Sequence, residues 1–377
     1  MEEKIRLCCP CHFGLERTLK FEIGQLGGED LQVEDGRIHF TGTYATLAAA
    51  NICLSTAERV LVELGSYTAT TYEALFDGME KLPLEKWIGP EDAFPVKGHT
   101  LDSKLHSVPD CQSILKKAAV RRLEKAYHQT WFPETGPKHA LQFQLRKNKV
   151  TIYLDTSGAG LHKRGYRWQG GGAAPLKETL AAGIVDIARV KADSVVCDPL
   201  CGSGTILIEA AMKACRVAPG LHRHFQAEQW AQVPKNVWAE AREEARSKIR
   251  RDTAFVAYGS DIDAEAIALA EENCRRAGVA GRVRLKQADV QDFQPPEGGA
   301  ITICNPPYGE RLMDMQQAEA IYRVLGDVFP ANKKYPAYIL SPDPDFALHF
   351  GREPDKRRKL YNGMIMCYLM EYYQDPA

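Results

Sequence analysis

The second half of the chain alternates short apolar runs with longer amphipathic stretches. Apolar runs bounded by glycine, proline or aspartate are typical of buried strands, whereas apolar residues spaced three and four apart mark helices. The predicted strands are 194–197, 255–258, 283–285, 300–303 and 337–340, and the predicted helices are 175–187, 206–214, 264–277 and 316–329. This alternation predicts an α/β fold with an open, mostly parallel sheet. A final β hairpin is expected to turn at Asn362-Gly363.

The first half of the chain predicts two smaller α/β units. In the first unit, strands are expected at 4–9, 31–33, 37–41 and 60–66, and helices at 14–26, 46–57 and 72–82. The second unit begins near Phe94, with a strand at 94–97, a helix at 113–128 and a hairpin of strands 141–146 and 150–155. Helices and strands therefore alternate through the whole chain.

Positive charge is concentrated in the second of these units. The 377-residue chain has a formal net charge of −1, yet residues 101–172 contain 13 Lys and Arg against 5 Asp and Glu. Such a local excess predicts a surface that binds phosphates, although a solvated basic face without a ligand is the alternative. The candidates on the predicted helix 113–128 are Lys116, Lys117, Arg121 and Arg122.

The connection between the two halves is rich in glycine and carries basic residues among aromatic ones. Its cationic candidates are His162, Lys163, Arg164 and Arg167, and the neighbouring aromatic residues are Tyr166 and Trp168. Basic groups interleaved with aromatic rings are typical of single-stranded nucleic-acid binding. A flexible hinge with incidental charge is the alternative.

A strand, a glycine loop and a helix start follow one another at Asp198-Pro-Leu-Cys-Gly202-Ser-Gly204-Thr205. This order is typical of a nucleotide-binding turn. No Gly-Lys-Ser/Thr follows, as a Walker loop requires, and the third glycine of the dinucleotide fingerprint is missing. A ligand without a pyrophosphate therefore fits this loop better.

Polar side chains also follow the next three predicted strands. Asp261 is positioned to accept hydrogen bonds from both hydroxyls of a ribose, and Asp289 is positioned to accept one from an adenine amine. Asn305 follows the fourth strand. Ligands of open parallel sheets bind beyond the carboxyl ends of the strands, so these positions predict one shared site.

The stretch Asn305-Pro-Pro-Tyr308 predicts recognition of a base that carries an exocyclic amine. The two prolines end the preceding strand, because neither has an N–H for the sheet. The Asn305 amide oxygen and the Pro306 carbonyl are two acceptors for one NH₂ group, and the Tyr308 ring is a stacking surface. The alternative is a Pro-Pro turn with a buried tyrosine.

Composition excludes several classes of protein. No run approaches 18 apolar residues and the first residues lack a secretory pattern, so neither a membrane span nor export is expected. Eleven cysteines, mostly in apolar runs, predict reduced buried thiols and a cytoplasmic protein. The spacing of Cys8, Cys9, Cys11 and His12 does not fit zinc, and His222 and His224 in the insertion 216–252 are expected at the surface. We therefore predict no metal site.

The four strand-end motifs together resemble those of the class I S-adenosylmethionine-dependent amino-methyltransferases. With Leu-His-Lys-Arg-Gly-Tyr-Arg at 161–167 and Asn-Pro-Pro-Tyr-Gly-Glu-Arg at 305–311, the chain is similar to THUMP-domain RNA guanine-N2 methyltransferases of the RlmL type. Some members carry a second methyltransferase domain after the first, and we expect no second activity of that kind in a chain that ends at Ala377.

The resemblance implies an architecture of four parts. We expect a ferredoxin-like unit at 1–55, a THUMP RNA-binding domain at 56–157, a basic linker at 158–174 and a Rossmann-like class I methyltransferase with a seven-stranded sheet at 175–377. It also implies S-adenosylmethionine as cofactor. The implied cofactor-binding set is Asp198, Pro199, Gly202, Gly204, Thr205, Asp261, Ile262, Asp289, Val290 and Asn305.

The activity that the resemblance implies is methylation of the exocyclic N2 of a guanine in 23S rRNA, either free or in a large-subunit assembly intermediate. Asn305, Pro306 and Tyr308 are the expected catalytic residues. Three alternatives stay open: a tRNA guanine-N2 methyltransferase, a DNA adenine-N6 methyltransferase, and an RNA-binding ribosome-assembly factor without enzymatic activity.

Overall fold

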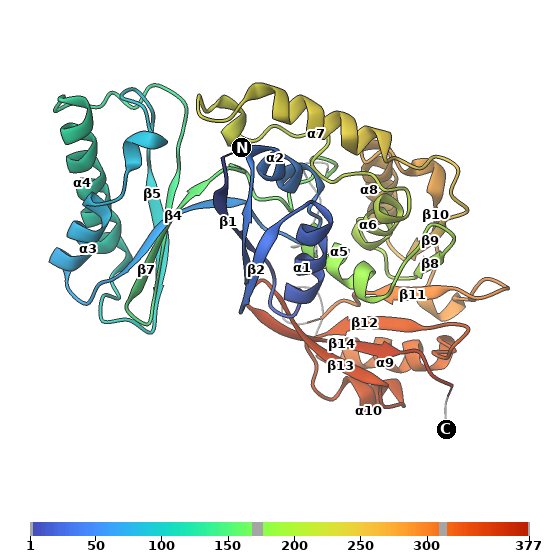
Figure 1. Ribbon diagram of the computed structural model, residues 1–377. Helices are drawn as coiled ribbons and strands as arrows, with labels where there is room; N and C mark the ends of the chain where they lie inside the picture. Colours follow the sequence, from blue (N-terminus) through green and yellow to red (C-terminus); the bar gives the residue numbers. More distant parts are fainter. Residues whose placement is uncertain (1–2, 168–175, 309–314, 376–377) are drawn as a thin grey trace.

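Two seven-stranded sheets organise the protein, which was analysed as a computed structural model (Figure 1). The structure describes residues 3–167, 176–308 and 315–375. Within these residues no helix is both long and apolar enough to cross a membrane, and no cluster of His, Cys, Asp and Glu has the arrangement of a metal site. Cys8, Cys9, Cys11 and His12 are buried, and the cysteines are free.

The first sheet has the order β2-β3-β1-β4-β7-β6-β5. Its strands are β1 (Ile5–Pro10), β2 (Glu29–Glu34), β3 (Arg37–Gly42), β4 (Leu61–Thr68), β5 (Val96–Leu101), β6 (Leu141–Arg146) and β7 (Lys149–Asp155). Its helices are α1 (Glu16–Gln25), α2 (Tyr44–Cys53), α3 (Tyr72–Glu80) and α4 (Val108–Tyr127). The predicted strands and helices of the first half are confirmed, apart from shifted ends.

Strand β4 joins what the sequence presented as two units. It pairs antiparallel with β1 on one side and with β7 on the other, so the hydrogen-bond ladder is continuous. The sequence did not predict this continuity, because pairing between strands far apart along the chain has no local signal. The two units predicted in the first half therefore share one continuous sheet.

The second sheet has the order β10-β9-β8-β11-β12-β14-β13. Its strands are β8 (Val195–Asp198), β9 (Val256–Asp261), β10 (Val283–Gln287), β11 (Ile301–Cys304), β12 (Ala337–Ser341), β13 (Lys356–Asn362) and β14 (Ile365–Tyr372). Strands β8 to β12 are parallel, and the hairpin β13–β14 adds an antiparallel edge. Strand order reverses between β8 and β11, which makes this pair the topological switch point.

Helices on this sheet are α5 (Glu178–Ile187), α6 (Thr205–Ala214), α8 (Ala264–Arg276), α9 (Met315–Val328) and the short α10 (Phe346–Phe350), which the sequence did not reveal. Helix α5 begins at Glu178 rather than at the predicted Pro175, which lies outside the described residues. Helix α6 is apolar almost all round and is buried, as expected for the helix that follows the central strand. The predicted α/β architecture is confirmed.

Helix α7 (Lys235–Ser247) lies in the insertion of the second half yet packs on the first half. Figure 1 shows it lying across α2, and its inward residues join the N-terminal core. Phe225 stacks on Trp238 with ring centroids 5.5 Å apart, and Trp87 meets Trp230 edge-on at 6.2 Å. The insertion therefore connects the two halves through a shared hydrophobic core. His222 and His224 are exposed, as predicted.

Candidate active site

Three of the four predicted polar positions come together at the carboxyl edge of adjacent parallel strands, and the fourth follows at the switch point. Asp198 ends β8 and Asp261 ends β9, while Asp289 lies just beyond β10. The register pairs Asp261 with Gln287 and Asp198 with Gly259, so these ends lie at the same level. Asn305 follows β11, which is the other neighbour of β8.

The glycine loop is locked onto the end of β9. The backbone N–H of Gly202 donates to Oδ2 of Asp261 at 2.9 Å, and that of Cys201 donates to the Ser260 carbonyl at 2.9 Å. Gly202 and Gly204 have positive φ angles of 49° and 80°. Gly204 precedes α6, and a Cβ on it would lie 3.1 Å from that of Ala270. The backbone of the loop at Gly204 thus lies so close to α8 that a side chain there would crowd Ala270.

Asp261 and Asp289 are organised by the backbone around them. Asp261 also accepts from the N–H of Asp263 at 3.0 Å, and Asp289 accepts from the N–H of Gln291 at 2.9 Å. Between these two carboxylates the chain displays Ile262, whose side chain is 66% exposed, whereas Val290 is buried. Two fixed acceptors beside an exposed apolar side chain suit a ligand with both a polar sugar and a flat base.

The carboxyl group of Asp198 is almost fully buried. It is 2% exposed and accepts from the N–H of Leu200 at 3.2 Å. Burial raises the pKa of Asp198 to about 8, and the nearby Asp261 adds to the shift. A cationic group placed beside this carboxyl would favour its charged form. S-adenosylmethionine carries a sulfonium and an ammonium, so the loop fits this cofactor.

Asn305 presents a buried acceptor that no described residue satisfies. Its Oδ1 atom has no hydrogen-bond partner among the described residues. The buried residues Cys304 and Pro306 hold it from either side. Leaving such a carbonyl unpaired costs about 1–3 kcal/mol, which indicates a place kept for an external N–H donor.

Tyr308 is held by the terminal hairpin. Its hydroxyl accepts from Nδ2 of Asn362 at 2.8 Å, and Sγ of Cys367 lies 3.9 Å away. Burial raises the pKa of Tyr308 above its ordinary value, so it stays a neutral phenol. The hairpin therefore fixes the ring from its polar end. The sequence did not reveal Asn362 as its partner, because the two lie on different elements.

The predicted RNA-binding role of Arg164 is wrong for the folded protein. Arg164 is 6% exposed and pairs with Glu209 of α6 at 3.4 Å. Its guanidinium also donates to the carbonyls of Leu161, at 2.7 Å, and Ser55. Because a buried cation with an internal partner cannot also reach an RNA phosphate, this residue anchors the connection to α6.

Arg167 also has internal partners, although its side chain is 25% exposed and its RNA-binding role stays a prediction. Its guanidinium pairs with Glu178 and donates to Oγ1 of Thr205 at 3.1 Å and Oγ of Ser203 at 3.3 Å. It thereby ties the connecting segment to the glycine loop. His162 lies 3.5 Å from Glu58 and is partly buried, whereas Lys163 is exposed. Of the four predicted cations here, Lys163 is the one left at the surface.

Helix α4 divides its predicted cations into two kinds. Lys117 and Arg121 are exposed, and Arg121 has only a neighbouring Glu124 of its own helix at 3.4 Å. Lys116 instead pairs with Glu134 and lies 3.4 Å above the Phe94 ring, and burial lowers its pKa. Arg122 pairs with Glu85. RNA binding by the exposed pair stays a prediction, while the other two have structural contacts.

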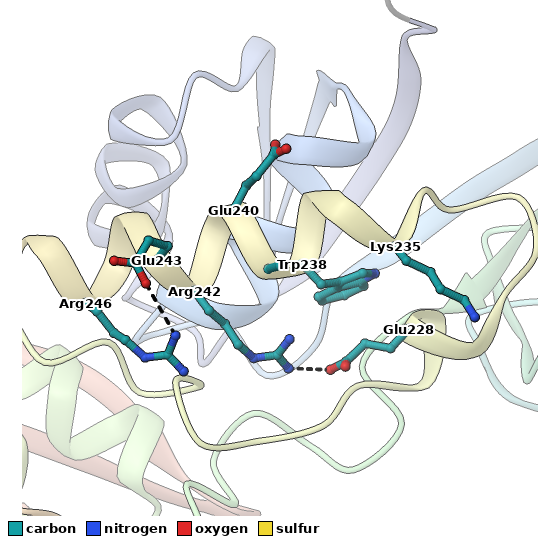
Figure 2. Close-up of a pocket in the computed structure, with 8 residues that line it drawn as sticks. Glu228, Lys235, Trp238, Glu240, Arg242, Glu243 and Arg246 are labelled. Carbon is teal, nitrogen blue, oxygen red and sulfur yellow. Dashed lines mark hydrogen bonds and ion pairs between the residues drawn. The ribbon is translucent and has the colours of Figure 1, made fainter.

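A separate groove of about 670 Å³ runs along α7 and is shown in Figure 2. Its polar lining is largely satisfied internally, since Arg242 pairs with Glu228 at 2.6 Å and Arg246 lies 3.6 Å from Glu243. None of the strand-end residues lines it. The groove is therefore distinct from the strand-end site.

Three family models match the chain in succession. They are the RlmL ferredoxin-like domain at residues 6–61, the THUMP domain at 69–155 and the RMKL-like methyltransferase domain at 164–371. The predicted domain boundaries at residues 55, 157 and 174 stay a prediction.

Two curated relatives are similar over nearly the whole chain. A Bacillus subtilis protein described as putative RNA methyltransferase YpsC is 38% identical over 374 residues, covering 99% of this chain and 96% of that protein. The ribosomal RNA large subunit methyltransferase K/L of Methylococcus capsulatus is 33% identical over 94% of this chain. The match covers 49% of that longer protein, so the chain spans about half its length.

Two solved structures are similar throughout. SMU.472, described as a putative methyltransferase complexed with SAH, superposes with a TM-score of 0.92 at 37% identity and full coverage of both chains. A predicted N6-adenine-specific DNA methylase from Listeria monocytogenes has the same TM-score at 39% identity, covering 99% of this chain and 97% of that one.

Proposed function

The chain belongs to the RMKL-like methyltransferase family, and from this premise we propose that it methylates the exocyclic N2 of a guanine in RNA, with 23S rRNA as the substrate. Its cofactor is S-adenosylmethionine. The observation that carries the choice of an amine is the orphaned buried Oδ1 of Asn305 at the switch point. An amine N–H is the donor that this oxygen lacks.

The cofactor supplies a methyl group already activated by its positive sulfur. The chain's own residues then need mainly to align it. We assign Asp198 and the glycine loop to the amino-acid part, Asp261 to the ribose, and Asp289 with Ile262 and Val290 to the adenine. Pro199 and Thr205 shape the loop. Each assignment follows from the acceptors and the open backbone described above.

Asn305 and Pro306 act on the target amine. A guanine N2 is a poor nucleophile because its lone pair is conjugated with the ring. Hydrogen bonds to the Asn305 oxygen and the Pro306 carbonyl favour a tetrahedral nitrogen and stabilise its growing positive charge. No strong base is required, since the methylated amine is acidic and loses a proton to water. Tyr308, held by Asn362, stacks on the base.

An RNA substrate is supported by the THUMP match at residues 69–155 and by the descriptions of both curated relatives as RNA methyltransferases. The match to the K/L enzyme supports large-subunit rRNA in particular, free or during assembly, and a cytoplasmic setting. A tRNA guanine is the second candidate. The description of the Listeria protein favours DNA adenine instead, because an adenine amine suits the same Asn-Pro-Pro-Tyr acceptors.

Tritiated-methyl transfer distinguishes these substrates. The protein is incubated with labelled S-adenosylmethionine and, in separate reactions, deproteinised 23S rRNA, tRNA and duplex DNA. We expect label in 23S rRNA, recovered as N2-methylguanosine after nuclease digestion. Label in N6-methyladenine of DNA would contradict the proposal, and an absence of transfer to all three would favour the non-enzymatic assembly factor.

A further inference from the structure

The tip of the β13–β14 hairpin exposes three consecutive apolar side chains. Met364 is 98% exposed, Ile365 is 43% exposed and Met366 is 39% exposed. Gly363, with a φ of 64°, and Met364 form the two-residue connection between the strands. Runs of exposed apolar residues are unfavourable in water unless they serve a contact. These exposed side chains therefore indicate a surface that a binding partner covers.

The register of the hairpin places the tip beside the candidate active site. Asn362 lies opposite Ile365, and Leu360 lies opposite Cys367, so these four side chains share one face. On that face, Asn362 and Cys367 hold the hydroxyl of Tyr308. Ile365 is thus the next position outward from the partners of the stacking tyrosine.

Strand β13 of this hairpin carries exposed positive charge. Lys356, Arg357 and Lys359 are exposed on β13, which is the edge strand of the sheet. On the other face of the hairpin, Lys359 lies 5.5 Å from the Tyr361 ring, and Phe13 of the N-terminal unit meets that ring edge-on at 5.7 Å. Cations beside apolar and aromatic side chains are complementary to a nucleic acid, since they match phosphates and base faces together.

We propose that Met364 and Ile365 form an RNA wedge that enters the space left by the target guanine when it turns out of its helix. This inference rests on the proposed function. Extruding a base costs unstacking energy, and apolar side chains inserted between bases offset part of it. Ile365 lies opposite Asn362, which holds Tyr308, so one side of the hairpin receives the base while its tip replaces it in the stack.

The test compares folded and unpaired RNA. Initial rates of tritiated-methyl transfer are measured on folded 23S rRNA and on the same RNA hydrolysed to short, unpaired fragments, for the wild type and a Met364→Ser/Ile365→Ser variant. The wedge predicts that the ratio of the folded rate to the unpaired rate falls roughly tenfold in the variant. Leu348→Ser, which removes a 78% exposed apolar side chain on α10, is the matched control and should keep the wild-type ratio.

Each result separates the two proposals. An active wild type and a variant with an unchanged ratio would overturn the wedge alone. If the wild type also self-associates in sedimentation and the variant with the unchanged ratio does not, the tip is a protein contact instead. A wild type that methylates neither RNA overturns the proposed function and the wedge with it. Because both substituted residues are exposed, unfolding by urea should match the wild type.

Discussion

Two polar stretches of the molecule have opposite chemistry. In the connecting segment 158–167, Arg164 and Arg167 each have an internal acid, Glu209 and Glu178. At the strand ends, Asp198 and Asn305 are buried polar groups whose needs the protein leaves unmet. The charged side chains of the first stretch therefore stabilise the fold, whereas the polar side chains of the second stretch can bind ligands. The type of residue alone does not distinguish them.

Two buried asparagines sharpen this contrast. Asn51 on α2 donates to the Leu47 carbonyl at 3.0 Å and to Oγ1 of Thr156 at 2.9 Å, and its Oδ1 accepts from Ser157 at 2.6 Å. Its amide is fully used in tying α2 to Thr156 and Ser157, the two residues that follow β7. Asn305 has the same side chain but an orphaned oxygen. A buried amide thus marks a site only when its partners are missing.

The largest effect is expected from Arg164→Ala. Removing this cation leaves the buried Glu209 without its partner, which should lower the free energy of unfolding by about 3–5 kcal/mol. Urea denaturation measures it, with the exposed neighbour Lys163→Ala as the matched control. Equal stabilities of the two variants would show that Arg164 is not a structural anchor, and would return it to the RNA-binding set.

Asn305→Ala should have the next largest effect, this time on activity. Loss of the acceptor should lower the rate of methyl transfer by roughly 10²- to 10³-fold while the dissociation constant for S-adenosylhomocysteine changes little. Rates and calorimetric binding give the two readouts. Asn51→Ala should do the reverse, losing about 1–3 kcal/mol of stability with its rate retained. Parallel losses of binding and rate in Asn305→Ala would count against an amine-binding role.

Asp198 predicts a distinctive pH dependence. Because burial raises its pKa from 3.8 to about 8, the folded protein keeps a proton in this range that the unfolded chain has released. Its contribution to stability therefore declines as the pH rises from about 4 to about 8. The difference between wild type and Asp198→Asn in urea denaturation without cofactor should show this slope. Parallel curves would mean that the carboxyl group is already ionised.

The smallest effect concerns the exposed cations. Replacing Lys117, Arg121 and Lys163 with alanine should weaken binding of 23S rRNA several-fold and reduce the slope of log K against log salt by about 0.7 for each lost phosphate contact. Stability should stay unchanged, in contrast to Arg164→Ala. Lys20→Ala, an exposed cation on α1, is the control. A slope that does not change would place the RNA elsewhere.

The strand-end positions could be predicted because their signals are local. Each consists of an apolar run followed at once by Asp, Asn, Gly or Pro, and the parallel topology brings such ends together. The partner of Arg164 could not be predicted, since Glu209 lies 45 residues away on a mostly apolar helix. The same holds for Asn362, which reaches Tyr308 across 54 residues of chain.

The packing partner of helix α7 could not be predicted, for a related physical reason. The sequence predicts a charged helix at about 234–251, and most of α7 is polar. Its few large apolar residues, Phe225, Trp230 and Trp238, are nevertheless buried in the core of the first half. The sequence shows that these residues are apolar, but it does not show against which half they pack.

The position of α7 has a consequence for how the chain is made. Translation proceeds from the N-terminus, and domains generally fold as they emerge. Here α2 remains uncovered until the ribosome has released residues up to Ala245, which belongs to the same hydrophobic cluster. The hydrophobic core of the N-terminal half therefore stays incomplete until α7 has been synthesised. Nascent chains halted before α7 should be the ones that recruit chaperones and proteases.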